Sequence, residues 1–468
     1  MSNSIGKHIV GTTAFFMLVL SLVVRMINGS QGIISPEDLL NIVSVETSFF
    51  VASIIIGLKK WLGSLLKITV VFVIMFCLYM FGQLLLMSIN CLSTPFLDGK
   101  FSYTECIDSI MDVHTYLAFF LLGLTFAKTY RGHLEYVPDK KGVKVGYWVL
   151  VLSLPFYILV VGEKLMFVIL YGYASLYQDV SLDAIPSGYK ILSYFFMSGV
   201  FFLFFSSERK SRDEKIGITL LIIHCALSLA MGYRAQTMTP ILLLLYGLQV
   251  KRMNFERRKT GLGKGMLFMM AICAFLVLFI FPAVRESRNE GGLSTMSADE
   301  IFTNNAIFET VHDMGKSLQT HVYTKQLVPE KYPYRYGYTY LMNLTTAMPN
   351  LFWSRHPAEV YGSLGKWLTK IVNYDFYAFG GALGYSCVAE AYINFGYIGI
   401  ILIAFIFGFT LLSVENKVEY YNSPIMYASL CIVSMYLVSY SRGEFADLVR
   451  GFFWYMLIPR LMYKYIRK

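Results

Sequence analysis

Residues 66–89, LKITVVFVIMFCLYMFGQLLLMSI, contain a single charged side chain, that of Lys67. A helix of about 20 apolar residues is long enough to cross the hydrocarbon core of a bilayer. Similar runs recur along nearly the whole chain of 468 residues, which is 56% hydrophobic and only 15% charged. Soluble domains usually contain about 25% charged residues. The sequence therefore predicts an all-α polytopic membrane protein and excludes a soluble enzyme.

We expect about twelve transmembrane helices, several of them shorter than the ideal length. The first run is too long for a cleavable signal and ends in Arg25 and Asn28 rather than in small residues, so it is expected to remain as a span. The predicted spans are residues 9–27, 39–58, 66–89, 114–127, 145–161, 189–205, 216–231, 238–250, 266–282, 392–412, 424–439 and 451–463.

The basic residues are distributed unevenly between the loops. With this span count, one side of the membrane collects 24 of the 40 lysines and arginines. Since cytoplasmic loops carry the excess of basic residues, both termini are predicted to be cytoplasmic. A net charge of +10 could also suggest nucleic-acid binding. The clustering between apolar runs is better explained by orientation in the membrane, so we exclude a nucleic-acid partner.

One connection is much longer than the others and divides the chain into three predicted regions. These are residues 1–283 with about nine spans, residues 284–384 as a large loop on the outer face, and residues 385–468 with about three spans. Loops of this length are usually functional or carry their own structure. Ser297 to Glu300 reads as a capping box that opens a helix, and the alternating tyrosines from Tyr332 to Tyr340 predict an extended segment.

Motifs for common cofactor chemistry are missing from the sequence. It contains no Gly-x-x-x-x-Gly-Lys-Ser/Thr loop, no His-Glu-x-x-His pair and no Asp-x-Asp pair, so we expect neither a cofactor nor a metal. The seven cysteines are scattered. Only Cys91 and Cys106 share a predicted loop, where they would either form a disulfide, if that loop faces an oxidising compartment, or remain free.

Several arginines are predicted to lie on the outer side. A guanidinium group matches phosphate oxygens in two-point contacts, so arginines that converge on one cleft would bind a diphosphate without a metal. The alternative for each is a side chain that reaches lipid headgroups. Arg234 and Arg442 lie in very short connections, where a desolvated site is more plausible. The set consists of Arg234, Arg285, Arg288, Arg335, Arg355, Arg442 and Arg450.

Aromatic and titratable side chains complete the candidate site. Tyr336, Tyr338 and Trp353 offer flat faces with polar edges that suit sugar rings, although an ordinary interfacial aromatic belt would look similar. His312, His321 and His356 are either structurally bonded or, near an acceptor hydroxyl, available as a base. Glu390 opens a predicted span, where a carboxylate can also act as a helix cap.

Residues 380–399, GGALGYSCVAEAYINFGYIG, resemble the signature of Wzy-type O-antigen polysaccharide polymerases. Two further stretches agree: residues 348–357, MPNLFWSRHP, and the turn Gly232-Tyr-Arg234. His356 stands where this family often has a lysine or arginine. The arrangement of many spans with one large loop in the C-terminal part covers the whole chain.

The resemblance implies a metal-independent glycosyltransferase of the bacterial inner membrane, with its large loop in the periplasm. Its donor and acceptor would be undecaprenyl-diphosphate-linked oligosaccharides, and a chain-length regulator would be a partner. We then expect diphosphate contacts from Arg234, Arg442 and Arg355, followed by Arg285, and a base at Glu390 or His312. Alternatives are an O-antigen ligase of similar architecture and a transporter of lipid-linked oligosaccharide or polysaccharide.

Overall fold

The computed structural model describes residues 2–30, 34–130, 132–171, 186–256, 306–348 and 353–466. In these ranges 81% of the residues are helical and no strand occurs. The predicted fold class, an all-α polytopic membrane protein, is therefore confirmed.

Among the described residues, seven helices are long and apolar enough to cross a membrane, and α19 (Pro424–Tyr440) is a shorter apolar helix. Together with α7 (Arg212–Ala230) and α8 (Arg234–Glu256), these helices cover the predicted spans up to residue 440, apart from residues 266–282, which lie outside the described residues. The count of twelve spans stays a prediction. The seven are α1 (Ser2–Gly29), α2 (Pro36–Leu62), α3 (Ile68–Ser88), α4 (Tyr103–Thr125), α5 (Lys140–Tyr171), α6 (Ser187–Ser206) and α18 (Cys387–Tyr421).

Helix α4 begins at Tyr103 and not at residue 114, so the predicted loop before it was too long. Ser102 and Glu105 form a capping box in which each side chain accepts a hydrogen bond from the other's backbone N–H. The first turns of α4 carry acidic residues, which lower the local hydropathy and conceal the helix. Cys106 is buried on α4, and both Cys106 and Cys91 are free thiols.

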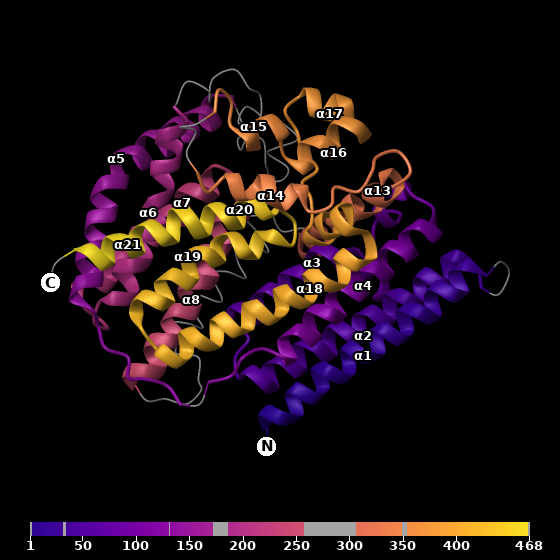
Figure 1. Ribbon diagram of the computed structural model, residues 1–468, viewed down its shortest axis with the longest axis horizontal. Coiled ribbons are helices and arrows are strands. Elements are labelled where there is room, and N and C mark those ends of the chain that lie inside the picture. The colour runs from indigo at the N-terminus through magenta and orange to yellow at the C-terminus, as the bar shows by residue number, and fades with distance from the viewer. Residues whose placement is uncertain are drawn as a thin grey trace. The chain divides into compact units, whose positions relative to one another are not determined.

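The first of two compact units comprises residues 1–130, 308–417 and 440–447. In it α1 packs along α2 and α4, and α2 packs on α3 (Figure 1). Helices α4 and α18 cross at two glycines. A Cβ atom added to Gly123 would lie 2.2 Å from the carbonyl oxygen of Phe405, and one added to Gly408 would lie 2.1 Å from that of Phe120. Small residues let membrane helices approach this closely, so α18 is held firmly against α4.

The segment predicted as a large loop is largely helical where it is described. Helix α12 approaches α3 through glycines, since a Cβ atom on Gly82 would lie 2.5 Å from the carbonyl oxygen of Val311. Helix α13 packs against α4 and α16. The described elements are α12 (Ala306–Gly315), η6 (Lys316–Leu318), α13 (Gln319–Leu327), α14 (Tyr338–Thr345), α15 (Pro357–Tyr361), α16 (Leu364–Val372) and α17 (Tyr374–Ala378). The predicted capping box at residues 297–300 lies outside the described residues.

The run of alternating tyrosines is not one extended segment, so that prediction was wrong beyond Arg335. Tyr336 and Gly337 adopt positive φ angles of 47° and 84°, and α14 begins at Tyr338. Glycine takes such a φ at little cost, so Gly337 permits the turn that sends the chain into a helix.

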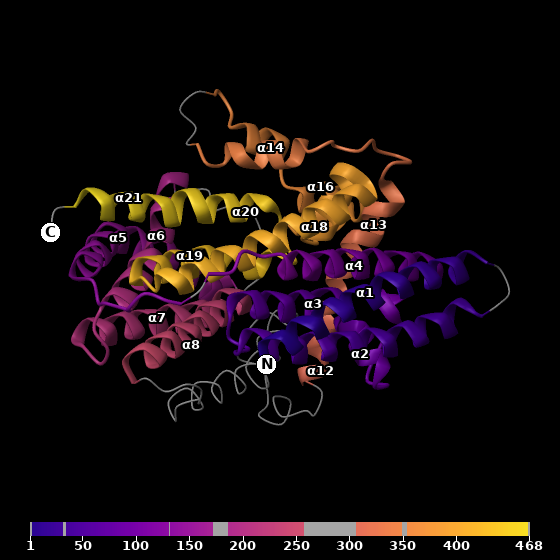
Figure 2. The same cartoon turned by 60° about the horizontal axis from the view of Figure 1, so that its bottom comes forward.

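The second unit comprises residues 131–307, 418–439 and 448–468. Helix α5 packs along α6, α6 on α7 and α7 on α8, as Figure 2 also shows. A buried ion pair joins α8 to α7, with Nζ of Lys251 3.0 Å from Oε1 of Glu214. The C-terminal helices are α20 (Phe445–Arg450), which begins in the first unit, the π-helical segment η7 (Gly451–Leu457) and α21 (Ile458–Tyr465).

Candidate functional site

Helix α18 is interrupted at Gly396, which has a φ of 60° and a ψ of −142°. The break frees two carbonyl groups, and the segment before α14 satisfies them. The backbone N–H groups of Arg335 and Tyr336 donate to the carbonyl oxygens of Ile393 and Asn394, each over 2.9 Å. The side-chain oxygen of Asn394 accepts from the N–H of Gly337 over 3.0 Å. The tyrosine-rich segment is thereby fastened to the stretch that carries the family signature.

Glu390 connects three segments in the interior of this unit. Its Oε1 accepts hydrogen bonds from the side-chain amide of Asn343 over 3.1 Å and from the hydroxyl of Thr339 over 3.3 Å. Its Oε2 accepts from the backbone N–H of Phe445 over 2.9 Å. The side chain is fully buried. Glu390 therefore does more than cap a helix, because it holds α14 and the start of α20 on α18.

The turn between α19 and α20 lies beside the same stretch. Oε1 of Glu444 accepts from the backbone N–H of Gly365 over 2.9 Å. A Cβ atom added to Gly384, which has a φ of +77°, would lie 3.4 Å from the carbonyl oxygen of Arg442 and 3.9 Å from its Nε. Arg442 is exposed. The structure thus brings this predicted arginine next to the family signature.

Tyr385 marks the centre of this arrangement. Its side chain is fully buried, and its hydroxyl lies 3.0 Å from the hydroxyl of Thr324 on α13. Burial raises the pKa of the Tyr385 phenol. The carboxyl groups of Glu390 and Glu444 raise this pKa further, whereas the guanidinium of Arg335 lowers it. Three ionisable groups from three separate segments therefore influence one buried phenol. We take this region as the candidate functional site.

The predicted sugar-binding residues lie in the part of the same unit that follows α13. Tyr336 is 77% exposed and Tyr338 is 48% exposed, and both flank the turn that is bonded to Asn394. Trp353 is half-buried and packs edge-to-face against His356, with ring centroids 5.4 Å apart. His356 caps α15, because its Nδ1 accepts from the N–H of Ala358 over 3.1 Å. Arg355 is exposed.

The other predicted site residues lie elsewhere or are not described. Arg234 is the first residue of α8 in the second unit, and its side-chain placement is not described. Arg285 lies outside the described residues. His312 is buried on α12, where its Nε2 lies 2.9 Å from the hydroxyl of Thr94. Convergence of the four diphosphate-binding arginines therefore stays a prediction. In the ranges that the structure describes, no group of three or more His, Cys, Asp and Glu residues is placed to hold a metal ion.

Comparison with known families decides the identity of the chain. The family model described as O-antigen polysaccharide polymerase Wzy matches residues 12–466. The chain belongs to this family. No curated protein and no solved structure matches it. The predicted resemblance is confirmed, and with it a multi-pass membrane protein of lipopolysaccharide biosynthesis that polymerises lipid-linked oligosaccharides.

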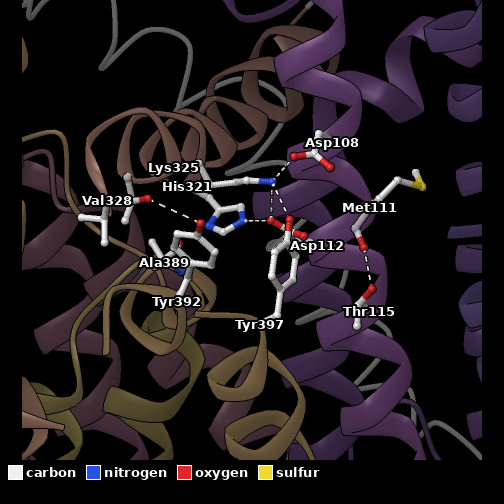
Figure 3. A network of polar contacts seen from close by, with 12 residues as sticks. Asp108, Met111, Asp112, Thr115, His321, Lys325, Val328, Ala389, Tyr392 and Tyr397 are labelled. Atoms are coloured by element: carbon white, nitrogen blue, oxygen red, sulfur yellow. Dashed lines mark hydrogen bonds and ion pairs between the residues drawn. The ribbon is translucent and has the colours of Figure 1, made fainter. Parts of the chain in front are cut away.

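The polymerase also contains a buried charge cluster that sequence reasoning missed (Figure 3). The carboxylate of Asp112 on α4 is fully buried and meets three donors. These are a guanidinium nitrogen of Arg25 at 2.5 Å, Nζ of Lys325 at 2.8 Å and Nε2 of His321 at 3.0 Å. Asp108, one turn earlier, binds Arg25 over 2.7 Å and also pairs with Lys325. Two carboxylates therefore neutralise two cations.

Tyr397, directly after the break in α18, lies over this cluster. Its hydroxyl is 3.3 Å from Arg25 and 3.4 Å from Lys325. Tyr392, one turn before it, packs edge-to-face on His321, with ring centroids 5.5 Å apart. The cluster thus joins α1, α4 and α13 of the polymerase beside the signature stretch. The spacing of Asp108 with Asp112 and of His321 with Lys325, each four residues apart, was the only local signal for it.

For both His321 and Lys325 on α13, burial lowers the pKa and the neighbouring carboxylates raise it. Burial lowers the pKa of His321, and its hydrogen bond to Asp112 offsets this only in part, so the pKa stays below its ordinary value. Burial also works to lower the pKa of Lys325, but Asp112 and Asp108 outweigh it and the pKa is raised. In this polymerase His321 is therefore neutral while Lys325 keeps its charge.

Proposed function

We propose that this polymerase joins undecaprenyl-diphosphate-linked repeat units into O-antigen polysaccharide at the periplasmic face of the bacterial inner membrane. The observation that carries the proposal is the gathering, in one unit, of the signature stretch, the turn at Tyr336 and the turn at Arg442 around Glu390 and Tyr385. The sequence had singled out the signature stretch for the family resemblance, Tyr336 for contact with sugar and Arg442 for contact with diphosphate.

The reaction needs no external energy source, because the donor is already activated. A hydroxyl group at the non-reducing end of one lipid-linked unit attacks the anomeric carbon of a chain on another lipid. A new C–O bond forms, the bond between the anomeric carbon and the diphosphate breaks, and undecaprenyl diphosphate leaves with the bonding electrons. The hydroxyl proton passes to a base. The enzyme therefore has to stabilise negative charge on the diphosphate and accept one proton.

Arg442 is the first candidate for the diphosphate contact. Its guanidinium is exposed at a turn beside Gly384, and it forms no ion pair with any residue that the structure describes. A guanidinium that carries no carboxylate partner is available for a two-point contact with phosphate oxygens. We assign Arg234, Arg355 and Arg285 to the same diphosphate, in a mechanism that uses no metal. The leaving group would then be stabilised by arginine side chains alone.

For the base we propose Glu390 first, because it lies within the gathered segments. The hydroxyl of Thr339, at 3.3 Å, is the longest of its three contacts. An acceptor hydroxyl that displaced Thr339 would meet the carboxylate at hydrogen-bond distance. His312 is the second candidate and lies against Thr94 instead. Tyr336, Tyr338 and Trp353 are proposed to pack against sugar rings of the two substrates.

The proposed orientation places both termini in the cytoplasm and the segment from residue 284 to residue 384 in the periplasm. The three predicted regions, residues 1–283, 284–384 and 385–468, are kept as part of this proposal. The unequal distribution of lysine and arginine supports it. A chain-length regulator is proposed as a partner on family membership alone.

Gel analysis of lipopolysaccharide from a deletion strain tests the function. Loss of a polymerase leaves the lipid core capped with one repeat unit, and this is the expected result. Loss of a ligase would instead leave free polymer that is not attached to core. Loss of a transporter would remove repeat units from the periplasm altogether, so core without any repeat unit would also reject the proposal.

A further inference from the structure

Arg335 is held between aromatic rings on the outer segment of the first unit. The centre of its guanidinium lies 4.9 Å from the ring centroid of Trp367 and 5.2 Å from that of Tyr361. One guanidinium nitrogen also donates a hydrogen bond to the hydroxyl of Tyr361. The backbone N–H of Arg335 is bonded to Ile393 over 2.9 Å. Both ends of the residue are therefore fixed, so the orientation of the guanidinium is set before any ligand arrives.

The described part of the chain supplies no carboxylate to this cation. No ion pair joins Arg335 to a described residue, and its side chain is half-buried. The two nearby acids are engaged otherwise. Glu390 accepts from Thr339, Asn343 and Phe445, and Glu444 accepts from Gly365. Arg335 thus keeps most of its five N–H donors for a partner outside these residues.

The surroundings of Arg335 indicate what kind of anion it would meet. Tyr336 and Tyr338, the proposed sugar-binding residues, are its near neighbours in the chain, and Tyr338 packs edge-to-face on Tyr361 at 5.3 Å. Tyr332 packs in the same way on Trp367 at 5.5 Å. Aromatic faces suit sugar rings, and a guanidinium fork suits carboxylate or phosphate oxygens. The combination fits a saccharide that carries an oxyanion close to a ring.

We propose that Arg335, held by Trp367 and Tyr361, binds an oxyanion of the lipid-linked saccharide. This inference rests on the proposed function and extends it with a residue outside the four assigned to the diphosphate. Two sources share the required chemistry: the diphosphate at the reducing end, and a carboxylate on an acidic sugar of the repeat unit. The two sources are distinguished by separate probes.

Binding to the purified full-length protein in detergent tests the inference. Undecaprenyl diphosphate is compared with uncharged undecaprenol, and D-glucuronate with D-glucose, while tryptophan emission is followed. Trp367→Phe identifies the part of the signal that comes from the ring beside Arg335. Arg335→Gln is expected to weaken binding of one charged probe at least about tenfold and to leave its neutral counterpart unchanged. Arg335→Lys should recover this only in part, because an ammonium group cannot form the two-point contact.

Lys370→Gln is the matched control. Lys370 is an exposed cation on the same helix as Trp367, with Nζ 5.8 Å from the ring centroid of Tyr377, and its removal should change affinity less than twofold. A loss confined to undecaprenyl diphosphate assigns the reducing-end diphosphate, and a loss confined to glucuronate assigns an acidic sugar. Unchanged affinity for both charged probes overturns the inference, as does a wild-type protein that binds neither. If Arg335→Gln does not fold, equal affinities of Arg335→Lys and wild type overturn it instead.

The binding result is independent of the polymer phenotype. A deletion strain with normal polymer would reject the proposed function and leave measured anion binding by Arg335 in place. Loss of polymer in the deletion strain, combined with unchanged affinities in Arg335→Gln, would reject only the inference about Arg335.

Discussion

The imidazole Nε2 of His321 lies 3.0 Å from Oδ2 of Asp112, although 209 residues separate the two in the chain. Both side chains are fully buried. His321 belongs to α13, which also contacts Tyr385 through Thr324, and Asp112 belongs to α4, which is long and apolar enough to span a membrane. This contact therefore ties α13 to α4. The position of the candidate site therefore depends on a charge cluster that need not touch substrate.

Asp112→Ala is expected to lower the free energy of unfolding by about 3–5 kcal/mol, because it leaves two cations and an imidazole around one partly exposed carboxylate. Unfolding of the detergent-purified protein measures this loss. The control is Asp98→Ala, which removes pairs with Lys100 at 3.2 Å and Lys316 at 2.9 Å. Those side chains are 30–49% exposed, so the control should cost about 0–1 kcal/mol. Equal losses of unfolding free energy in the two variants would mean that the buried cluster stabilises the fold no more than the exposed ion pairs do.

Acidification is expected to destabilise the fold through His321. Because burial lowers the pKa of His321 in the folded protein, the unfolded chain binds more protons between that lowered value and the ordinary value of about 6.5. The stability contribution is complete above about pH 6.5 and is lost as the pH falls toward the folded pKa. Unfolding midpoints at pH 7.5 and pH 5 should therefore differ less in His321→Gln than in wild type. His133→Gln, at an exposed position, should keep the full difference, and a His321→Gln variant that also kept it would contradict the assignment.

The sequence predicted the spans well where the signal is local. Crossing a bilayer requires a continuous apolar run, as in α3, and any window of residues reveals such a run. The start of α4 was missed because Asp108 and Asp112 lower the hydropathy of that segment, while the cations that neutralise them come from α1 and α13. A local window cannot show this compensation.

The candidate site was also predictable only in part. The signature stretch at residues 380–399 was recognised, and the structure gathers it with the segments of Tyr336 and Arg442. The partners of Glu390 were not foreseen, since Asn343 and Phe445 are 47 and 55 residues away. The sequence suggested a helix cap or a base for Glu390, and neither role indicated that the carboxylate joins three segments.

Arg442→Ala is expected to reduce polymer formation by about 10²–10³-fold, the usual effect of removing a donor that stabilises transition-state charge. The protein should still reach the membrane at its normal level, because the side chain is exposed and forms no ion pair with the described residues. Arg442→Lys should also lose most activity, since a point charge does not reproduce two-point phosphate contact. Lipopolysaccharide gels and membrane immunoblots measure both quantities, with Lys366→Ala, an exposed cation on α16, as the control. Normal chain lengths in Arg442→Ala, or full activity with lysine, would remove the diphosphate assignment.

Tyr336→Ala is expected to reduce polymer without changing stability by more than about 0.5 kcal/mol, because the side chain is 77% exposed. Tyr336→Phe should retain activity if the ring packs on sugar, since the stacking face is preserved. Tyr465→Ala removes an equally accessible tyrosine, 75% exposed on α21, and should leave polymer unaffected. Chain-length distributions on gels give the activity, and unfolding midpoints give the stability. A Tyr336→Ala strain with wild-type chain lengths would exclude this ring from the sugar site.

Glu390→Gln separates the proposed proton transfer from the structural role of the same side chain. Glu390→Ala leaves the donors of Thr339, Asn343 and Phe445 without an acceptor, so a loss of at least about 3 kcal/mol in unfolding free energy is expected. Glutamine keeps the shape and one oxygen acceptor, and it should cost much less. It cannot accept a proton at catalytic strength, so a base at this position predicts folded protein with no polymer.

His312→Gln is the matched comparison for this experiment. If Glu390 is the base, the His312 variant should still form polymer, because its imidazole lies on α12 against Thr94. Polymer from Glu390→Gln and none from His312→Gln, with both proteins present in the membrane, would transfer the base assignment to His312. Polymer from both variants would show that neither side chain takes the proton, and Glu390 would then serve only to hold α14 and the Phe445 turn on α18.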